Sequence, residues 1–302
     1  MILICDHRGM ALLKALRPLR GAGFELESTL NLRESRAQLE AQKPDLVILD
    51  PLGSSGSVEI DELVRICSAD PATPILLVSD PGAPDAILSS AQQLNGIVWD
   101  VVRRDAGPAE YSLRITRLLA EAKQAAELVD LRYRAAHDDL TDLWRPLYFQ
   151  ARLEEHFSAA QRHGLDLSLV LVDLDDFGII NKRFDHTIGD RVLAHVARAI
   201  RKTLRAEDIA GRIGGDEFAI VLPYTGTLEA AFTVQRICQV ISELSGCVSD
   251  DKGPLSVSAS IGFESTNGVE IASVEDLRSN AEYALKRAKK SGGNRAVFFR
   301  SR

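Results

Sequence analysis

Apolar residues in the first 105 positions come in short runs, and the stretches between them have the spacing of amphipathic helices. The runs predicted to be buried strands are Ile2–Cys5, Leu46–Leu49, Ile75–Val78 and Gly96–Val98. This alternation predicts a parallel sheet covered by helices, with functional side chains at the carboxyl ends of its strands. The polar residues at or just past those ends are Asp6, Asp50, Ser79 and Arg103.

These end positions resemble those of a response-regulator receiver domain, which has a flavodoxin-like fold. Asp50 stands at the phosphoacceptor position and Ser79 at the hydroxyl position. His7 replaces the second acid of the first pair, and Arg103 replaces the usual lysine. Losing an acid weakens the Mg²⁺ site that neutralises phosphoryl charge. Two interpretations stay open: a histidine kinase phosphorylates Asp50, or Asp50 only ends a strand.

A single long helix is predicted from about Pro108 to Ala136, because this stretch is rich in Ala, Leu, Glu, Lys and Arg and contains no glycine. The apolar stripe along it consists of Tyr111, Ile115, Leu118, Ala122, Ala125 and Val129. The spacing fits either a coiled-coil seam or a helix packed on its own domain. Its position between two domains favours a stalk that makes a homodimer.

A second α/β pattern follows Asp138–Leu143. Ser168–Asp175 is a buried strand that runs into two acids, with a helix starting at about Phe177. Arg212–Leu222 is predicted to form a hairpin with two glycines at its turn. If this hairpin pairs beside the strand, Asp173 and Asp216 meet within metal-bridging distance. The sequence leaves open whether Asp175 points the same way as Asp173.

Composition indicates a soluble protein of about two domains, with 302 residues, 45% of them hydrophobic and a net charge of −7. The acidic balance disfavours nucleic acid as a partner. No apolar segment approaches the roughly 20 residues that span a membrane, and the start lacks the features of a signal peptide. We therefore expect a cytoplasmic protein with no membrane partner. Its four cysteines, Cys5, Cys67, Cys238 and Cys247, have no metal-site spacing and are expected to be free thiols.

The sequence Gly214–Phe218 reads Gly-Gly-Asp-Glu-Phe and is identified as the signature of the GGDEF family, the diguanylate cyclases. Four more blocks stand in order at the family's spacing: Asp173–Phe177 with Asn181, His186–Asp190, Ser260–Gly262, and Ala288-Lys289. The resemblance covers residues 137–302. It implies an α/β, nucleotidyl-cyclase-like GGDEF domain at 137–302. Together with the receiver resemblance and the helix pattern, this divides the rest of the chain into a receiver-like domain at 1–105 and a stalk at 106–136.

The resemblance implies that two GTP molecules condense into cyclic di-GMP with release of pyrophosphate, one GTP being held by each domain of a dimer. The implied catalytic residues are Asp173, Asp216 and Glu217, with Glu217 as a metal ligand or the general base. The same three side chains and the Leu174 carbonyl would hold Mg²⁺ or Mn²⁺.

The implied GTP-binding residues fall into two groups. Asn181 and Asp190 would bind the guanine edge. The phosphates would be bound by the amides of Asp176, Phe177 and Gly178 at a helix start, by Lys289, and beside the turn at Gly214 and Gly215. Arg205 and Asp208 match the family's inhibitory RxxD site, which implies that the product cyclic di-GMP also binds there as an inhibitor.

This chain departs from the family at two positions that usually carry phosphate-binding cations. Gly178 replaces a lysine and Gly293 replaces an arginine, while Lys182 and Asp185 replace an aspartate and a glycine. Lys182 would partly replace the first cation, and Lys290 or Arg295 the second. We expect weakened GTP binding. The alternative is a catalytically weakened module that senses GTP or cyclic di-GMP.

Overall fold

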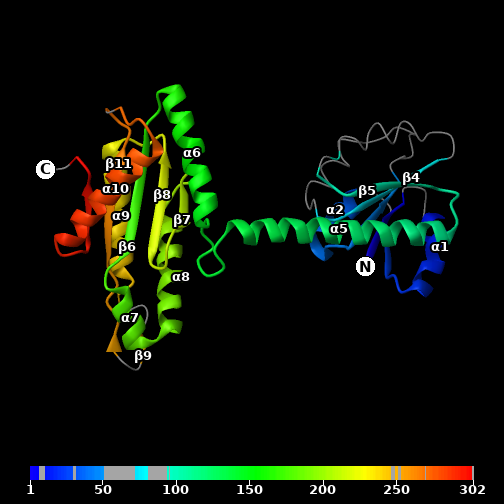
Figure 1. The fold of residues 1–302 in the computed structure, drawn as a ribbon. Coiled ribbons are helices and arrows are strands. Elements are labelled where there is room, and N and C mark those ends of the chain that lie inside the picture. Colours follow the sequence, from blue (N-terminus) through cyan, green and yellow to red (C-terminus); the bar gives the residue numbers. More distant parts are fainter. Residues whose placement is uncertain are drawn as a thin grey trace. The chain divides into compact units, whose positions relative to one another are not determined.

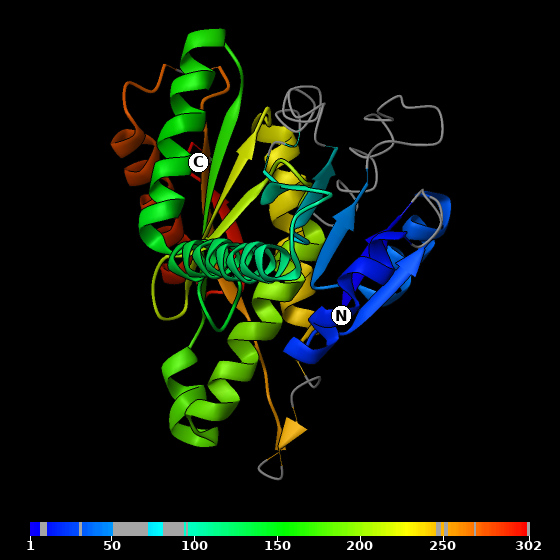
Figure 2. The same cartoon turned by 90° about the vertical axis from the view of Figure 1, so that its right-hand side faces the viewer.

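The computed structural model describes residues 1–6, 11–29, 32–50, 72–80, 94, 96–245, 249–250, 253–268 and 270–300. The chain divides into two compact units, Met1–Leu131 and Arg132–Arg302 (Figure 1, Figure 2). Three residues of the sequence-based predictions, His7, Cys67 and Cys247, lie outside the described residues. Cys5 and Cys238 are free thiols. Within the described ranges, no helix is long and apolar enough to cross a membrane.

The first unit is built on a five-stranded sheet in the order β2-β1-β3-β4-β5, and every neighbouring pair in it is parallel. This is the strand order of flavodoxin-like folds. The strands are β1 (Ile2–Cys5), β2 (Leu26–Thr29), β3 (Leu46–Leu49), β4 (Ile75–Ser79) and β5 (Trp99–Arg103). The described helices are α1 (Ala11–Leu16), the 3₁₀ helix η1 (Arg17–Ala22), α2 (Leu32–Gln42) and α5 (Pro108–Ala136).

Three of the four predicted strands are confirmed, and the fourth was wrong. The last strand begins at Trp99, whereas Gly96–Val98 forms the turn before it, in which Gly96 has a φ of 83°. The turn is more apolar than the strand, which carries Asp100 and Arg103, so the apolar pattern selected the wrong segment. β2 was missed because only its two end residues are buried.

The predicted long helix is confirmed as α5, and its apolar stripe divides into two halves. Tyr111, Ile115 and Leu118 are buried in the core of the first unit. Ala122 is half-buried, and Val129 is 65% exposed within the single chain. The first half therefore packs on its own domain. For the second half, the coiled-coil seam stays a prediction.

The second unit has a five-stranded sheet in the order β12-β11-β6-β8-β7, in which only β11 and β12 are parallel. Its strands are β6 (Leu167–Leu174), β7 (Ile209–Arg212), β8 (Glu217–Pro223), β11 (Ala259–Ser265) and β12 (Arg295–Phe298), and β9 (Ser249–Asp250) and β10 (Gly253–Pro254) form a separate hairpin. Its helices are α6 (Pro146–His163), α7 (Phe177–Phe184), α8 (His186–Thr203), α9 (Thr227–Glu243) and α10 (Val274–Lys290).

Alternating residues of the central strands separate the core of this unit into two layers. Val170 and Val172 on β6 pack with α7, α8 and α9 on one face of the sheet. Leu169 and Leu171 pack with α6 and α10 on the other face (Figure 1). Both faces are covered, so every residue of β6 is buried, including the acid near its end.

β11 packs closely against α10 at Gly262. A Cβ at this position would overlap with the backbone of Ala281 and Leu285. We predict that Gly262→Ala destabilises the protein by about 1–3 kcal/mol, because the helix must move away from the sheet. Gly178→Ala is the matched control, since nothing lies within 4 Å of a Cβ there. Chemical unfolding of the three proteins measures this, and a Gly262→Ala variant as stable as the control would contradict the packing.

Candidate functional site

The register of the second sheet gathers charged residues in one row. Asp173 on β6 pairs with Glu217 on β8 and with Ser260 on β11, and Ser260 pairs with Arg295 on β12. Residues paired in this way project from the same face of a sheet. This is the face that α6 and α10 cover. The hairpin thus pairs beside the acidic strand, the arrangement on which the expected meeting of Asp173 and Asp216 depends.

Asp173 is a buried acid held by a cation from α10. It is 6% exposed, and the Nζ of Lys289 donates to its Oδ2 at 2.5 Å. Burial raises the pKa of Asp173, Lys289 opposes this effect, and the negative charges of Asp216 and Asp175 add to it. A buried carboxylate with acidic neighbours and a raised pKa fits a place where a cation binds.

The metal ligands implied by the sequence are not yet gathered around one point. Within the described part of the chain, no group of three or more His, Cys, Asp or Glu side chains is arranged to hold a metal ion. Asp216 is half-buried in the turn before β8, and Glu217 is exposed at the first position of that strand. The amide of Leu174 donates to the carbonyl of Asp216 at 3.2 Å, which joins the two acidic segments. The donor set is oxygen only and fits Mg²⁺ or Mn²⁺, so these ligands stay a prediction.

Asp175, whose direction the sequence left open, is bound to β11 and to the turn before β12. Its carboxylate accepts hydrogen bonds from the hydroxyls of Ser258 at 2.8 Å and Ser260 at 2.6 Å. It also accepts the backbone amide of Asn294 at 2.8 Å. Asp175 thus fastens the end of β6 to β11 and to the turn before β12. With three donors it is satisfied without a metal.

The two glycines of the signature turn have different surroundings. A Cβ on Gly214 would lie 2.6 Å from Oε2 of Glu217, because the Glu217 side chain folds back over this residue. Nothing lies within 4 Å of a Cβ on Gly215, which is exposed and open to a ligand. Gly214 therefore makes room for the acid, and Gly215 leaves the outer side of the turn free.

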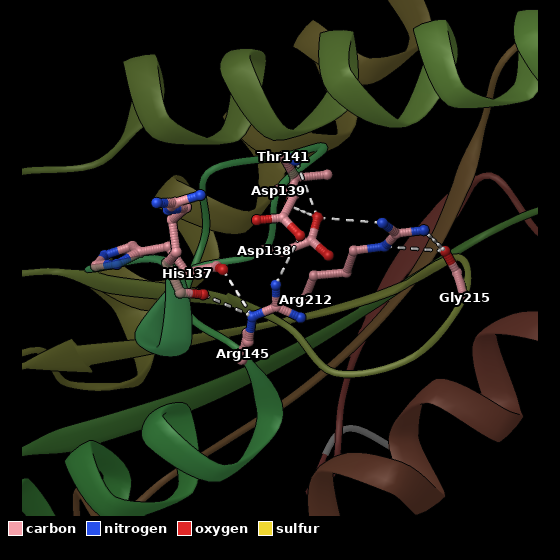
Figure 3. Close-up of polar contacts among 8 residues, drawn as sticks. His137, Asp138, Asp139, Thr141, Arg145, Arg212 and Gly215 are labelled. Carbon is pink, nitrogen blue, oxygen red and sulfur yellow. Dashed lines mark hydrogen bonds and ion pairs between the residues drawn. The ribbon is translucent and has the colours of Figure 1, made fainter. Parts of the chain in front are cut away.

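Arg212, which the sequence interpretation did not single out, holds this turn (Figure 3). Its Nε and Nη2 donate to the carbonyl of Gly215 at 3.2 and 2.7 Å, and its Nη1 donates to Asp138 at 3.1 Å. Asp138 also accepts the amide and hydroxyl of Thr141. Burial raises the pKa of Asp138, but the bonds from Thr141 and Arg212 outweigh it and lower the pKa overall. An ionised Asp138 thus connects the segment after α5 to the signature turn.

The segment between α5 and α6 is fixed further by Arg145. Its Nε donates to the carbonyl of His137 at 2.7 Å, and its Nη2 donates to Asp139 at 2.9 Å (Figure 3). Trp144 exchanges backbone hydrogen bonds with Ala210 and Arg212 on β7. The end of α5 is therefore joined to the strand that leads into the signature turn.

The implied phosphate-binding amides lie where the sequence predicted them. α7 begins at Phe177, directly after Asp176, which has a φ of 53° as the N-cap residue. Gly178 is exposed, and a side chain there would meet nothing within 4 Å. Amides at a helix N-terminus bind anions. The position of the missing lysine is thus sterically open in this chain.

The implied guanine-binding residues lie on adjacent helices. Asn181 on α7 packs directly against Gly189 on α8, the neighbour of the exposed Asp190. The Oδ1 of Asn181 is buried and has no hydrogen-bond partner among the described residues. A buried amide oxygen without a partner fits a site that a donor group of a ligand completes. Asp185, in place of the usual glycine, has a φ of 96° and caps α8 by accepting the amide of Ile188.

Residues 135–295, more than half of the chain, match the family described as "Diguanylate cyclase, GGDEF domain". The chain belongs to the GGDEF family. This match confirms the resemblance that the five sequence motifs indicated.

Among GGDEF relatives, the chain is similar to the diguanylate cyclase DgcP of Pseudomonas aeruginosa, with 36% identity over 184 residues, 60% of this chain and 27% of that protein. It is similar to the response regulator PleD of Caulobacter vibrioides, with 28% identity over 299 residues, 94% of this chain and 63% of that protein. The chain therefore spans less than two thirds of the length of either relative.

A solved structure of the coiled coil and GGDEF domain of DgcB from Caulobacter crescentus, in complex with c-di-GMP, has a TM-score of 0.55. The two sequences are 27% identical, and the aligned region covers 62% of this chain and 98% of the DgcB chain.

The RxxD segment of the GGDEF domain forms the loop between α8 and β7. The Asp208 carboxylate accepts the amide of Arg205 at 2.8 Å, so it closes the turn on which the exposed Arg205 side chain stands. Burial raises the pKa of Asp208, while the bond from Arg205 and the charge of Arg236 lower it, with a net rise. Arg236, on α9, also donates to the carbonyl of Thr203. The sequence interpretation missed Arg236 because it lies on a different element.

In the unit before the GGDEF domain, the residue that reaches Asp50 is Arg104 and not the predicted Arg103. Asp50 is fully buried and is ion-paired with Arg104, whose Nε also donates to Asp80 at 2.7 Å. Arg103 is the last residue of β5 and pairs with the exposed Asp105. The misplaced strand caused this error.

The two other predicted end positions of this unit are buried. The Ser79 hydroxyl donates to the carbonyl of Val102 at 3.4 Å. Asp6 accepts the amide of Leu12 at 2.7 Å. Phosphorylation of Asp50 stays a prediction.

The raised pKa of Asp173 leads to a stability prediction. Because burial disfavours the charged form in the folded state, ionised Asp173 costs stability above its folded pKa, and this cost disappears as the pH falls toward the ordinary value of 3.8. We predict that Asp173→Asn raises the Tm at pH 7 by about 2 °C without divalent ions.

Thermal unfolding with and without Mg²⁺ checks this prediction. The gain should shrink toward pH 4, and Mg²⁺ should stabilise the native protein but not the variant. An Asp173→Asn variant that melts below the native protein at pH 7 would contradict the interpretation.

Proposed function

We propose that this GGDEF protein is a diguanylate cyclase, which condenses two GTP molecules into cyclic di-GMP and two pyrophosphates. The observation that carries the proposal is the pairing of Asp173 with Glu217 at one edge of the sheet, beside Lys289 and the start of α7. Acids and phosphate-binding groups are thus close together. The family match and the DgcB complex with c-di-GMP support the same reaction.

In this proposal each GGDEF domain binds one GTP. Asn181 and Asp190 bind the guanine, because a carboxylate and an amide oxygen accept from the N1 and N2 hydrogens that adenine lacks. The amides of Phe177 and Gly178 bind the phosphates. Gly215 leaves the side of the turn open where the nucleotide lies.

The reaction forms a bond between the 3′-oxygen of one GTP and the α-phosphorus of the other, and it breaks the bond to the leaving pyrophosphate. The proton of the 3′-hydroxyl goes to a base, for which the exposed Glu217 is placed at the start of β8. Asp173, Asp216 and the Leu174 carbonyl would hold Mg²⁺ or Mn²⁺, with Glu217 as a further ligand where it is not the base. The ion would neutralise phosphate charge and activate the hydroxyl. Lys289, free to leave Asp173, would then turn to the phosphates.

One domain cannot close the ring alone, so two domains must face each other in a homodimer. The second half of α5 offers the predicted seam for this pairing, in which Ala125 is exposed and Val129 is 65% exposed. The contact from Asp138 through Arg212 to Gly215 links the end of that helix to the turn that carries the acids. A shift between two dimer arrangements would therefore reach the site without a change of its fold.

The first unit is proposed to be a receiver-like regulatory domain. Its strand order and the buried Asp50 support this role. Arg104 already neutralises the charge of the buried Asp50, so the unphosphorylated unit is stable as it stands. Phosphorylation of Asp50 by a histidine kinase would have to displace Arg104. The proposed reaction uses GTP and takes place in the cytoplasm.

A second candidate function is a sensor that binds GTP or cyclic di-GMP without turnover. The observation that favours it is the absence of side chains at Gly178 and Gly293, where the family has cations. The exposed Glu217, which a sensor does not need, favours the enzyme.

Replacing Glu217 separates the two functions. We predict that Glu217→Gln lowers cyclic di-GMP formation by at least ~100-fold, because a base or metal ligand is lost with little change in volume. The affinity for GTP should change far less. Product is quantified by chromatography after incubation with GTP and Mg²⁺. Equal turnover by native protein and variant would reject the role of Glu217, and a native protein that binds GTP without making product would be the sensor.

The proposed inhibitory site is tested at Arg205. Because its side chain is exposed while Asp208 holds the turn, Arg205→Ala removes the guanidinium and leaves the loop intact. We predict that the affinity for cyclic di-GMP falls about tenfold by titration calorimetry. Lys202→Ala, which removes an exposed cation near the end of α8, is the matched control and should bind as the native protein does. Equal affinities in all three proteins would reject this site.

A further inference from the structure

The turn between α10 and β12 has an unusual backbone. Gly292, Gly293 and Asn294 have φ values of 102°, 70° and 46°. The amide of Asn294 donates to Asp175, and a Cβ on Gly293 would lie 2.9–3.0 Å from three atoms of that carboxylate. Position 293 thus has both a left-handed conformation and direct contact with Asp175. Glycine tolerates both, and a residue with a side chain does not.

Gly293 therefore has a steric role in addition to removing the cation that the family has at this position. A side chain at this position would strain the backbone and push Asp175 from its three donors, Ser258, Ser260 and the Asn294 amide. Gly178 is different, because its surroundings are open.

The next cation along the turn is Arg295, the first residue of β12. It belongs to the row that contains Ser260 and Asp173, on the face that α10 covers. Its Nε donates to the carbonyl of Gly293 at 3.0 Å, which directs the guanidinium back along the turn. The side chain is exposed, and no carboxylate among the described residues forms an ion pair with it.

The turn also fastens the residue before Arg295 to the segment that leads into the predicted phosphate-binding amides. Asp175 binds the amide of Asn294, and it directly precedes Asp176, the N-cap residue of α7. Arg295 thus follows a residue that is fastened beside the start of α7. A guanidinium can bind two phosphate oxygens at once in a fixed geometry, whereas the ammonium of a lysine acts as a single point charge.

We propose that Arg295 binds the β- and γ-phosphates of GTP and that Asp175 and Gly293 position it. Arg295 thereby takes over the charge that the turn lacks at residue 293. This inference rests on the proposed GTP-binding function. It also assigns Asp175 to positioning, separate from the acids of the metal site.

The experiment measures the affinities for 3′-deoxy-GTP, which cannot condense, and for GMP by titration calorimetry with Mg²⁺. Arg295→Gln should lower the affinity for 3′-deoxy-GTP about tenfold and leave that for GMP unchanged. Lys286→Gln is the matched control, since Lys286 is an exposed cation on α10 that has no proposed role in the site, and it should bind both nucleotides as the native protein does. Equal losses for both nucleotides in Arg295→Gln, or none, would overturn the proposal.

A second variant tests the role of the glycine. Gly293→Arg restores the family's cation, yet it should not raise the affinity for 3′-deoxy-GTP and should lower the Tm, because the side chain displaces Asp175. A gain in affinity would overturn the positioning argument. The assay for cyclic di-GMP with the native protein is independent: if it fails while Arg295→Gln still discriminates between the nucleotides, the proposed reaction is wrong and the phosphate site stands.

Discussion

The antiparallel register of β6 with its two neighbours is the constraint on which the candidate site depends. It places Asp173 opposite Glu217 on one side and opposite Ser260 on the other, and through Ser260 it reaches Arg295. A slip of one residue would turn Asp173 to the other face, where Val170 and Val172 pack with α7, α8 and α9. Because both faces of β6 are buried, its apolar residues determine the register of the strand. The register in turn determines which face Asp173 lies on and which residues it pairs with.

Burying the carboxylates of Asp173 and Asp175 near the end of β6 costs free energy, and neighbouring groups offset this cost in different ways. Asp173 is paired with Lys289 and keeps a raised pKa, and we propose that a metal ion takes the place of this partner. Asp175 is satisfied by three hydrogen-bond donors and holds the backbone. Two acids that stand two residues apart therefore have different surroundings: Asp173 is held by one cation, and Asp175 by three hydrogen-bond donors.

The sequence predicted the elements with strong patterns and missed contacts between distant segments. α5 was predicted with its observed bounds, since a long stretch of helix-forming residues gives a clear signal. The fifth strand was misplaced, because the turn at Gly96 is more apolar than Trp99–Arg103. For this reason Arg103 was predicted at the end of that strand, whereas the cation that pairs with Asp50 is Arg104.

Among the predicted site residues, Asp173, Asp216 and Glu217 lie at one end of the central strands of a sheet, and Asp176, Phe177 and Gly178 lie at the start of a helix. The partners of these residues could not be derived from the order of the motifs. The bond from Arg212 to Asp138 joins residues 74 positions apart, and that from Asn294 to Asp175 joins residues 119 apart. Neither has a local signature. The same holds for Arg236 beside Asp208, and for the steric need for glycine at residue 293.

The central claim is that two copies of this chain, each holding GTP, close a ring between them. The most direct measurement incubates the native protein with GTP and Mg²⁺ over a range of protein concentrations and quantifies cyclic di-GMP and pyrophosphate. The account predicts two pyrophosphates per cyclic dinucleotide and a turnover per chain that rises with protein concentration until the dimer is saturated. GTP recovered unchanged at every concentration, from protein that binds it, would contradict the account.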